Sequence, residues 1–319
     1  MRILLTGARG FLGRHIRASP AAAGVRLFCA SRATHAQAER DVALGPGPWG
    51  RAEFAHALAF SRADAVIHCV GATHGADFRD LVEANAVPAA ELLAAVSAMA
   101  TPPRIILLGS AAEYGLVAAD AMPVGEDHPC RPRSEYGIAK HAQTLLGLAA
   151  AARGLPVLTA RLFNPVGIGM PPKLALPSFA RRIAAAAHGD GVVRVGDLDV
   201  GRDFIDVAEA ARLLLALARI PSWPWPVVNV CSGRAFKLRD LLESMIAASG
   251  RRLRVEVDPA LRRPDDMPLL IGGTARLAAV NLPPAAPDFE TVIPDLLSEA
   301  MLGRDRDHAA VRTADRSDQ

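Results

Sequence analysis

Tyr136 and Lys140 stand four residues apart in the segment Tyr-Gly-Ile-Ala-Lys, a spacing that suits acid–base chemistry. If this segment is helical, both side chains lie on one face. An ammonium group about 4 Å from a phenol, at an effective dielectric constant near 20, stabilises the phenolate by about 4 kcal/mol, or roughly 3 pKa units. The spacing therefore predicts that Tyr136 exchanges a proton with a substrate and that Lys140 lowers its pKa.

Lysine is scarce in this chain, and this makes a chance Tyr-x-x-x-Lys match less frequent. Of 36 basic residues only three are lysines, and we assign no function to Lys173 and Lys237.

Ser110 ends the apolar run Arg104-Ile-Ile-Leu-Leu-Gly-Ser110. The carboxyl ends of parallel strands are where such sheets bind ligands. We therefore expect Ser110 to hydrogen-bond a substrate carbonyl and to orient Tyr136.

A glycine-rich loop, Gly7-Ala-Arg-Gly10-Phe-Leu-Gly13, follows the first apolar run and opens the first predicted helix. In this context Gly7 allows a tight turn and Gly10 lets the backbone approach a pyrophosphate, which the helix N-terminus then binds. We predict a dinucleotide cofactor, in contact with a set of residues around the loop and the strand ends: Gly7, Arg9, Gly10, Phe11, Leu12, Gly13, Cys69, Val70, Gly71, Tyr136, Lys140 and Phe163.

The second apolar run ends at Ser31-Arg32, without the acidic residue that would bind the ribose 2′-hydroxyl of NAD. A hydroxyl and a guanidinium suit a 2′-phosphate, so we predict NADP(H) as the cofactor, with Arg9 assisting. We place Asp41 and Val42 beside the adenine. In the alternative interpretation, Ser31 and Arg32 only begin a solvated loop.

The elements that must position these residues alternate between short apolar runs and longer helical stretches. Strands are predicted at residues 2–7, 26–31, 64–71, 104–110 and 156–164, and helices near 11–19, 51–62, 78–100 and 134–153. Continuous apolar runs are typical of parallel strands buried on both faces. The pattern predicts an α/β protein with a doubly wound parallel sheet of Rossmann type over residues 1–165. A smaller α/β substrate-binding lobe would occupy 166–302, with a strand and helix near 205–233 returning to the main sheet and a flexible tail at 303–319.

Composition excludes several classes of protein. The chain has 319 residues, 51% hydrophobic and 22% charged, with a net charge of +3, which argues against disorder and against nucleic acid as a partner. Four scattered cysteines favour a reducing compartment. No apolar run is long enough for a membrane span or a signal peptide, so a cytoplasmic protein is expected. No Cys, His and carboxylate cluster has metal-ligand spacing, so no metal is predicted.

The glycine loop, Ser110, Tyr136 and Lys140 together resemble the extended branch of the short-chain dehydrogenase/reductase family. Three further segments resemble its nucleotide-sugar enzymes: Arg161-Leu-Phe-Asn164-Pro-Val-Gly167, Arg202–Val207 and Arg263-Pro-Asp-Asp266. The resemblance covers about residues 1–280, and the C-terminal half is most similar to the GDP-4-keto-6-deoxy-mannose reductases. It implies a nucleotide-diphosphate sugar as substrate, contacted by His74, Ala112, Asn164, Ser178, Arg202, Arg263 and Asp266. It also implies a homodimer formed through the Leu- and Ala-rich stretch at residues 134–154.

The residue two positions after Ser110 separates the reactions that this branch performs. Resembling dehydratases carry a Glu there and resembling fucose synthases a Cys, whereas this chain has Ala112, and the neighbouring Glu113 resembles a structural residue. With no acid–base group beyond Tyr136, hydride transfer alone remains. We therefore expect NADPH-dependent reduction of the 4-keto group of a GDP- or dTDP-linked 4-keto-6-deoxyhexose. A UDP-galactose-type 4-epimerase, which uses the same catalytic set, is the alternative, and a non-enzymatic NADP sensor is a further one.

Overall fold

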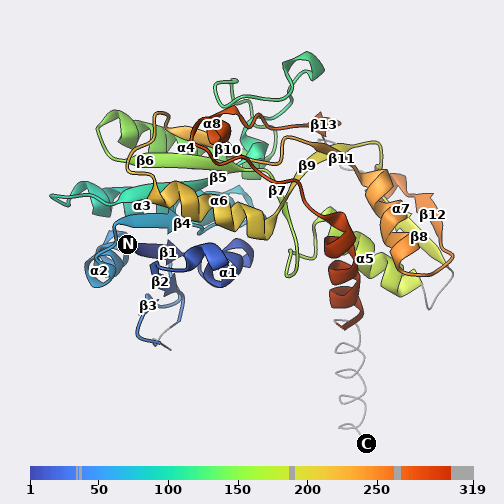
Figure 1. Cartoon of the computed structure of the whole chain (residues 1–319), viewed down its shortest axis with the longest axis horizontal. Helices are drawn as coiled ribbons and strands as arrows, with labels where there is room; N and C mark the ends of the chain where they lie inside the picture. The colour runs from blue at the N-terminus through green and yellow to red at the C-terminus, as the bar shows by residue number, and fades with distance from the viewer. Residues whose placement is uncertain (34, 36–37, 187–190, 262–266, 303–319) are drawn as a thin grey trace, which may run out of the picture.

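The computed structural model describes residues 1–33, 35, 38–186, 191–261 and 267–302. Seven described strands, all parallel, form the main sheet in the order β10-β6-β5-β4-β1-β2-β3 (Figure 1). Their bounds are Arg2–Thr6 (β1), Arg26–Ser31 (β2), Asp41–Ala43 (β3), Ala65–His68 (β4), Arg104–Ser110 (β5), Val157–Leu162 (β6) and Val227–Val230 (β10). This order is that of a doubly wound Rossmann sheet, so the predicted fold class is confirmed.

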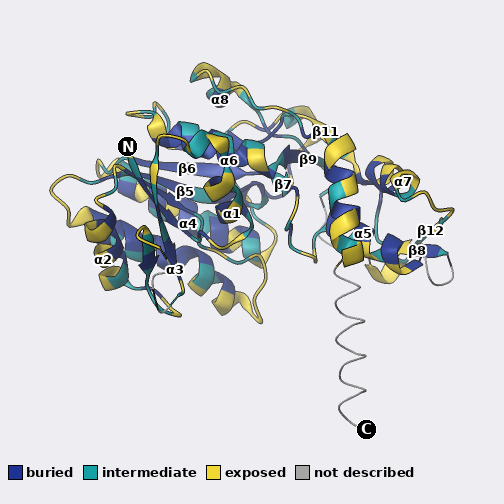
Figure 2. Cartoon of the chain, turned by 60° about the horizontal axis from the view of Figure 1, so that its bottom comes forward, coloured by how far each residue is buried: buried dark blue, intermediate teal, exposed yellow. Residues whose placement is uncertain are grey.

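Helices cover both faces of the main sheet. Helices α1 (Phe11–Ala18) and α6 (Val207–Arg219) pack on one face, where they meet Ile3, Leu5 and Ile67. On the other face, Leu4 and Val66 pack with α2 (Arg51–Ser61) and α3 (Phe78–Ser97). Residues that alternate along one strand thus enter different cores, which is why the strands are apolar throughout. Figure 2 shows these strands buried between helices whose outer faces are exposed.

Helix α4 (Glu135–Ala152) carries the Tyr136–Lys140 pair and begins at a well-defined cap. The Ser134 hydroxyl accepts a hydrogen bond from the main-chain N–H of Gly137 at 3.0 Å. Such a cap stabilises a helix by about 1 kcal/mol and fixes where its first turn begins. Tyr136 and Lys140 consequently occupy the first two turns of α4, beside the end of β5.

The lobe is made of short strands and helices from separated parts of the chain. One sheet joins β11 (Ala235–Lys237), β9 (Gly201–Asp206) and β13 (Leu269–Leu270), with β7 (Asn164–Val166) on β9, and a second pairs β8 (Val192–Val195) with β12 (Arg254–Val257). Helices α5 (Ala175–Ala186) and α7 (Leu238–Ala248) and a helical segment at 289–302 share a core with these strands. In Figure 1 the lobe stands beside the carboxyl edge of the main sheet.

The chain crosses between the two parts more than once. Strand β9 lies in the lobe, the following α6 packs on the main sheet, and β10 pairs with β6 in the main sheet. The short elements η1 (Pro20–Ala22), η2 (Ala111–Glu113), η3 (Ala119–Ala121), η4 (Pro259–Leu261) and α8 (Ala275–Ala279) complete the described fold. Strand β3 was not predicted, because three residues carry too little periodicity to indicate a strand. The expected tail at 303–319 lies outside the described residues.

Among the described residues, no helix combines the length and the apolar character that crossing a membrane requires.

Candidate active site

A cavity of about 1220 Å³ opens between the carboxyl edge of the main sheet and the lobe. Gly7 and Ser110 line it from the sheet, and Ser178, Asp197 and Leu261 line it from the lobe. This volume exceeds that of most sites for one small molecule. The cavity therefore offers room for two ligands, one on each side.

The three predicted catalytic residues meet in this cavity. Ser110 ends β5, and Tyr136 and Lys140 come from α4; all three side chains line the cavity. The Ser110 side chain lies next to the Tyr136 phenol. Lys140 is 3% exposed, and its Nζ donates to Gln143 Oε1 at 2.7 Å, while Gln143 Nε2 donates to the Leu108 carbonyl at 3.0 Å. Lys140 is thus anchored, through Gln143, to the strand that ends in Ser110.

The pKa of Tyr136 differs from the sequence expectation. Burial raises the pKa of the Tyr136 phenol, the neighbouring Ser110 side chain opposes this rise, and the charge of Glu113 adds to it. The net direction is opposite to the sequence expectation because burial dominates, and the Lys140 amine donates its hydrogen bond to Gln143; a lowering contribution of Lys140 to this pKa stays a prediction. Burial also lowers the pKa of Lys140 to about 8, against the opposing charge of Glu113. The arrangement holds Tyr136 in its protonated form at neutral pH, which is the form that can donate a proton.

Two buried polar side chains lie behind Lys140. His68, at the end of β4, is fully buried, and its Nδ1 lies 2.9 Å from the Thr6 hydroxyl. Burial, aided by the positive charge of Lys140, lowers the pKa of His68 to about 3, so the imidazole is neutral. Asn85 on α3 donates to the Ala72 and Leu81 carbonyls, but its Oδ1 has no protein partner. This side chain lines the cavity beside Gly71, so Asn85 offers an acceptor to a ligand.

The glycine loop fits a dinucleotide. Gly7 has φ of 69°, and a Cβ there would lie 2.7 Å from the main-chain carbonyl of Cys69, so only glycine allows this turn. No side chain caps α1 at Gly10, and its first turn has no acidic residue, which leaves its N–H groups for an anion. Apart from Arg9, the residues predicted to contact the cofactor around the loop and the strand ends all line the cavity: Gly7, Gly10, Phe11, Leu12, Gly13, Cys69, Val70, Gly71, Tyr136, Lys140 and Phe163.

A second, small hollow lies behind the glycine loop, at the ends of β1, β2 and β3. Arg9, Ser31 and Asp41 line it as the sequence predicts, together with Arg17, which sequence reasoning missed. Arg17 lies on α1, seven residues after Gly10, and only the folding of α1 over β2 brings it here. Arg32 is exposed and is not among the residues that line this hollow, and Val42 is buried in the core.

Most of the predicted substrate residues line the cavity: His74 and Ala112 from the carboxyl edge of the main sheet, and Asn164, Ser178 and Arg202 from the lobe. Asn164 Nδ2 donates to the Asp203 carbonyl at 2.8 Å, and Arg202 Nη1 donates to the carbonyls of Gly201 and Met267, which fixes both side chains. Arg263 and Asp266 lie outside the described residues. Sequence reasoning missed the other charged residues of this end, which come from separate segments: Arg133, Lys173, Arg182 and Asp197.

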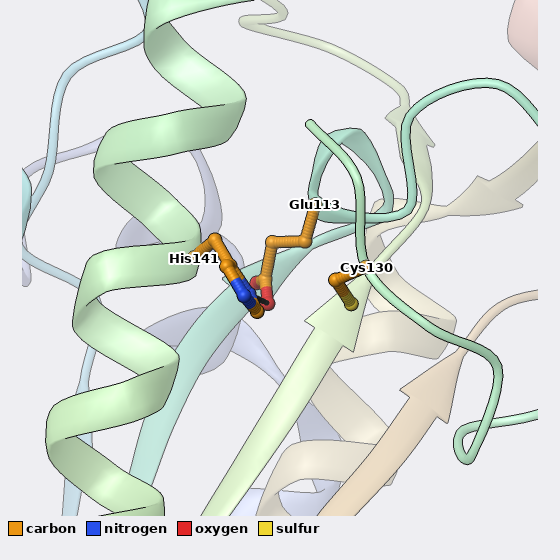
Figure 3. A group of neighbouring side chains, drawn as sticks. All are labelled: Glu113, Cys130 and His141. Atoms are coloured by element: carbon orange, nitrogen blue, oxygen red, sulfur yellow. Dashed lines mark ion pairs between the residues drawn. The ribbon is translucent and has the colours of Figure 1, made fainter. Parts of the chain in front are cut away.

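Among the described residues, Glu113, Cys130 and His141 bring one potential metal ligand each to within 4.8 Å of one another (Figure 3). The Arg161 guanidinium already pairs with this carboxylate, its Nε 3.1 Å from Glu113 Oε2. Because a guanidinium repels a metal cation, the cluster is better described as a buried ion pair. The expectation of no bound metal stays a prediction.

The fold and the site together define a dinucleotide-dependent α/β enzyme. Residues 3–231 match the family described as the NAD dependent epimerase/dehydratase family, and the chain belongs to this family. It is thus an NAD(P)-dependent enzyme of the nucleotide-sugar oxidoreductase and epimerase class.

Three relatives and one solved structure place the chain within this class. GDP-6-deoxy-D-mannose reductase of Pseudomonas aeruginosa is 33% identical over 86% of this chain and 89% of that protein. A dTDP-6-deoxy-L-talose 4-dehydrogenase (NAD(P)(+)) of Kitasatospora kifunensis is 33% identical over 81% and 82%. A UDP-glucose 4-epimerase of Azospirillum brasilense is more distant, at 27% over 86% and 85%. The structure of RMD from Pseudomonas aeruginosa with NADPH superposes with a TM-score of 0.78 at 28% identity, covering 94% of this chain and 99% of that one.

Proposed function

We propose that the protein reduces the 4-keto group of a nucleotide-diphosphate-linked 4-keto-6-deoxyhexose with NADPH. The observation that carries the proposal is the wall of the cavity beside Ser110. Ala112 lines the cavity where resembling dehydratases have a Glu, and its methyl group cannot remove a proton from carbon. The adjacent Glu113 is fully buried, paired with Arg161, and is not among the residues that line the cavity. Two of the relatives are named as enzymes that act on nucleotide-linked 6-deoxyhexoses, which supports the same class of substrate for this chain.

Each catalytic side chain has a separate role in this reaction. NADPH supplies the hydride when bound. The Ser110 hydroxyl donates a hydrogen bond to the sugar carbonyl oxygen and so orients it toward Tyr136. Tyr136 gives its phenolic proton to the same oxygen as the alcohol forms. The buried positive charge of Lys140 stabilises the phenolate that remains.

The proposal is tested with a panel of GDP- and dTDP-linked 4-keto-6-deoxyhexoses, following NADPH oxidation and identifying the product by NMR. We expect NADPH consumption with at least one of these sugars and no reaction of UDP-glucose. Interconversion of UDP-glucose and UDP-galactose without net NADPH consumption would instead identify a 4-epimerase. NADPH binding with no turnover of any sugar in the panel would favour a cofactor sensor.

We propose NADP(H) rather than NAD(H) as the cofactor on the basis of the small hollow behind the glycine loop. Arg9, Arg17 and Ser31 gather there, and two guanidiniums with a hydroxyl suit a 2′-phosphate. Asp41 lines the same hollow and would accept a hydrogen bond from a 2′-hydroxyl, so it limits how strongly the site prefers NADP(H) over NAD(H). We expect Arg17→Ala to weaken NADPH binding about tenfold and leave NADH binding unchanged. Arg51→Ala, at an exposed position on α2 outside both the cavity and the hollow, is the matched control, and an equal loss for both cofactors in Arg17→Ala would refute this assignment.

A homodimer is proposed from the outer faces of α3 and α4, which pack against each other. Val87, Ile138 and Leu145 on these helices are 38%, 42% and 52% exposed, respectively, although each is a large apolar side chain. Burying such a face against a second copy removes it from water. Analytical ultracentrifugation tests this expectation, and a monomer at micromolar concentration would refute it.

The four cysteines are free thiols, which suits the proposed cytoplasmic location.

A further inference from the structure

Gln143 is a buried polar residue of α4 that lies behind Lys140. It is fully buried and is not among the residues that line the cavity. Its Oε1 accepts a hydrogen bond from Lys140 Nζ at 2.7 Å, and its Nε2 donates to the main-chain carbonyl of Leu108 at 3.0 Å. Leu108 lies on β5, two residues before Ser110. A single amide therefore joins the lysine of the site to the strand that carries its serine.

The close packing of α4 on the main sheet lets Gln143 reach β5. Residues 136, 140 and 143 follow each other at helical spacing, so their side chains share one face of α4. Two glycines allow the helix to approach closely. A Cβ at Gly137 would lie 2.6 Å from the Ala112 carbonyl oxygen, and a Cβ at Gly147 would lie 2.9 Å from Leu107 Cδ1. Gln143 stands between these two contacts, at a point where α4 is held firmly against the sheet.

The two partners of the Gln143 amide determine its orientation. A main-chain carbonyl only accepts hydrogen bonds and an ammonium only donates them, so Nε2 must face Leu108 and Oε1 must face Lys140. A rotated amide would lose both hydrogen bonds. The amide thereby holds Nζ beside the turn after β4, where a Cβ at Gly71, a residue of the cavity wall, would lie 3.9 Å from it.

An amide satisfies a donor of the ammonium without neutralising its charge, and the titratable groups from the neighbouring elements leave that charge in place. His68 of β4 is neutral, because burial lowers its pKa to about 3. The Cys69 thiol after β4 is neutral as well, because burial raises its pKa to about 12. Glu113 of η2 pairs with Arg161, whose Nε lies 3.1 Å from its Oε2. The charge of Lys140 is therefore available to groups in the cavity.

We propose that Gln143 is a positioning residue that holds Lys140 through an uncharged acceptor, so that the full positive charge of the ammonium acts on Tyr136 and on the ligands in the cavity. A carboxylate at position 143 would hold the amine as firmly, but the resulting ion pair would have no net charge. The effect on the reaction rests on the proposed function, in which a positive charge stabilises the phenolate. The contact between Gln143 and Lys140 does not, because it is a property of the protein alone.

The test compares two substitutions that change the acceptor in opposite ways, in the whole protein without substrate. The chain has three lysines, so NMR of protein with ¹³C-labelled lysine gives three signals, and Lys140→Met identifies the signal of Lys140. Gln143→Glu keeps the acceptor and adds a charge, and we expect it to raise the midpoint of the Lys140 titration by about two pH units. Gln143→Met fills a similar volume without an acceptor, and we expect it to lower this midpoint by about one pH unit.

The control is Ala55→Glu, which adds the same charge at an exposed position of α2 and should leave the Lys140 midpoint unchanged. Either variant of Gln143 is sufficient for the test if the other does not fold. A midpoint that stays at the wild-type value in a folded variant of Gln143 would overturn the proposal.

With a sugar that the wild-type protein reduces, the rates of the two variants separate holding the amine from keeping its charge. We expect Gln143→Glu to lower kcat about tenfold or more at pH 7, although Lys140 is then fully protonated, because an ion pair stabilises the phenolate poorly. Gln143→Met should lose activity as the pH rises above 7, because the lysine loses its proton there. A wild-type kcat in Gln143→Glu would overturn the proposal, because a charged acceptor would then serve equally well. The expected lysine shifts without turnover of any sugar by the wild-type protein would refute the proposed function alone.

Discussion

The catalytic end and the lobe end of the cavity are built in different ways. Ser110, Tyr136 and Lys140 come from β5 and α4, which follow each other in the chain and share one hydrophobic core. Ser178 and Arg202 at the lobe end come from α5 and β9, which belong to a core assembled from short segments. Lys140 is buried and anchored through Gln143, whereas Arg202 is held by two main-chain carbonyls near the cavity surface.

This difference fits the roles proposed for the two ends. Bond making and breaking needs atoms held to within fractions of an ångström, and a buried, hydrogen-bonded site at the end of a parallel strand provides this. Recognition of a nucleotide diphosphate depends more on charge and on several distributed hydrogen bonds, and so tolerates a surface built from loops. Substitutions at the two ends should therefore affect different kinetic constants.

Tyr136→Phe should have the largest effect, and it should impair the reaction at the catalytic end without affecting binding at the lobe end. Loss of the phenolic proton should lower kcat by about 10²–10⁴, with NADPH affinity nearly unchanged, because the ring remains in place. Steady-state kinetics and cofactor titration measure the two quantities. Tyr114→Phe is the control. The hydroxyl of this buried tyrosine donates a hydrogen bond to Asn229 Oδ1 at 2.7 Å, and Tyr114 is not among the residues that line the cavity. If NADPH affinity falls as much as kcat, Tyr136 is not the proton donor.

Arg202→Ala should break the lobe end and leave the catalytic end intact. A guanidinium that binds a diphosphate contributes a charge-assisted hydrogen bond, so KM for the sugar nucleotide should rise about 10- to 100-fold, with kcat within a few-fold. Arg239→Ala is the matched control, because this arginine pairs with Asp199 on the surface of the lobe. A fall in kcat with unchanged KM would show that Arg202 acts on the transition state and would remove the contrast between the ends.

Lys140→Met should sharpen the comparison by showing that the buried charge of Lys140 at the catalytic end lowers the stability of the fold. The pKa of Lys140 falls from 10.5 to about 8 on folding, so the unfolded chain holds this proton more tightly than the folded protein. The charged lysine therefore destabilises the fold below pH 8, and this penalty decreases as the pH rises from 8 to 10.5. We expect Lys140→Met to raise the free energy of unfolding by about 3 kcal/mol at pH 7, with a smaller difference at pH 10. Urea unfolding at both pH values measures this, and a difference independent of pH would contradict it.

The residues predicted for the catalytic end lie together in the cavity, because the sequence signals that indicated them are local. Glycines at fixed spacing and a Tyr–Lys pair at helical spacing specify geometry within a few residues, and continuous apolar runs specify parallel strands. Arg17 escaped prediction because nothing in its neighbourhood on α1 distinguishes it from other exposed arginines. The other charged residues of the cavity were missed for the same reason, since Arg133, Lys173 and Asp197 come from separate loops and Arg182 from α5.

The direction of the Tyr136 pKa shows most clearly what local reasoning omits. Spacing places Lys140 near the phenol, and Coulomb's law then predicts a lowered pKa. The folded protein buries the phenol, turns the lysine toward Gln143 and adds the charge of Glu113, so the pKa rises. Desolvation and the orientation of one side chain depend on residues that are distant in the sequence.

The sequence alone predicted the Rossmann sheet, the glycine-rich loop and the candidate residues Ser110, Tyr136 and Lys140, which the structure brings into one cavity, because periodicity and spacing encode local backbone geometry. Only the tertiary structure decided how these groups are charged and which residues complete the cavity. Glu113 illustrates the distinction: its position beside Ser110 is visible in the sequence, but its pairing with Arg161, 48 residues away, exists only in the fold. Electrostatic environment depends on burial and on long-range neighbours, and these form when the chain packs.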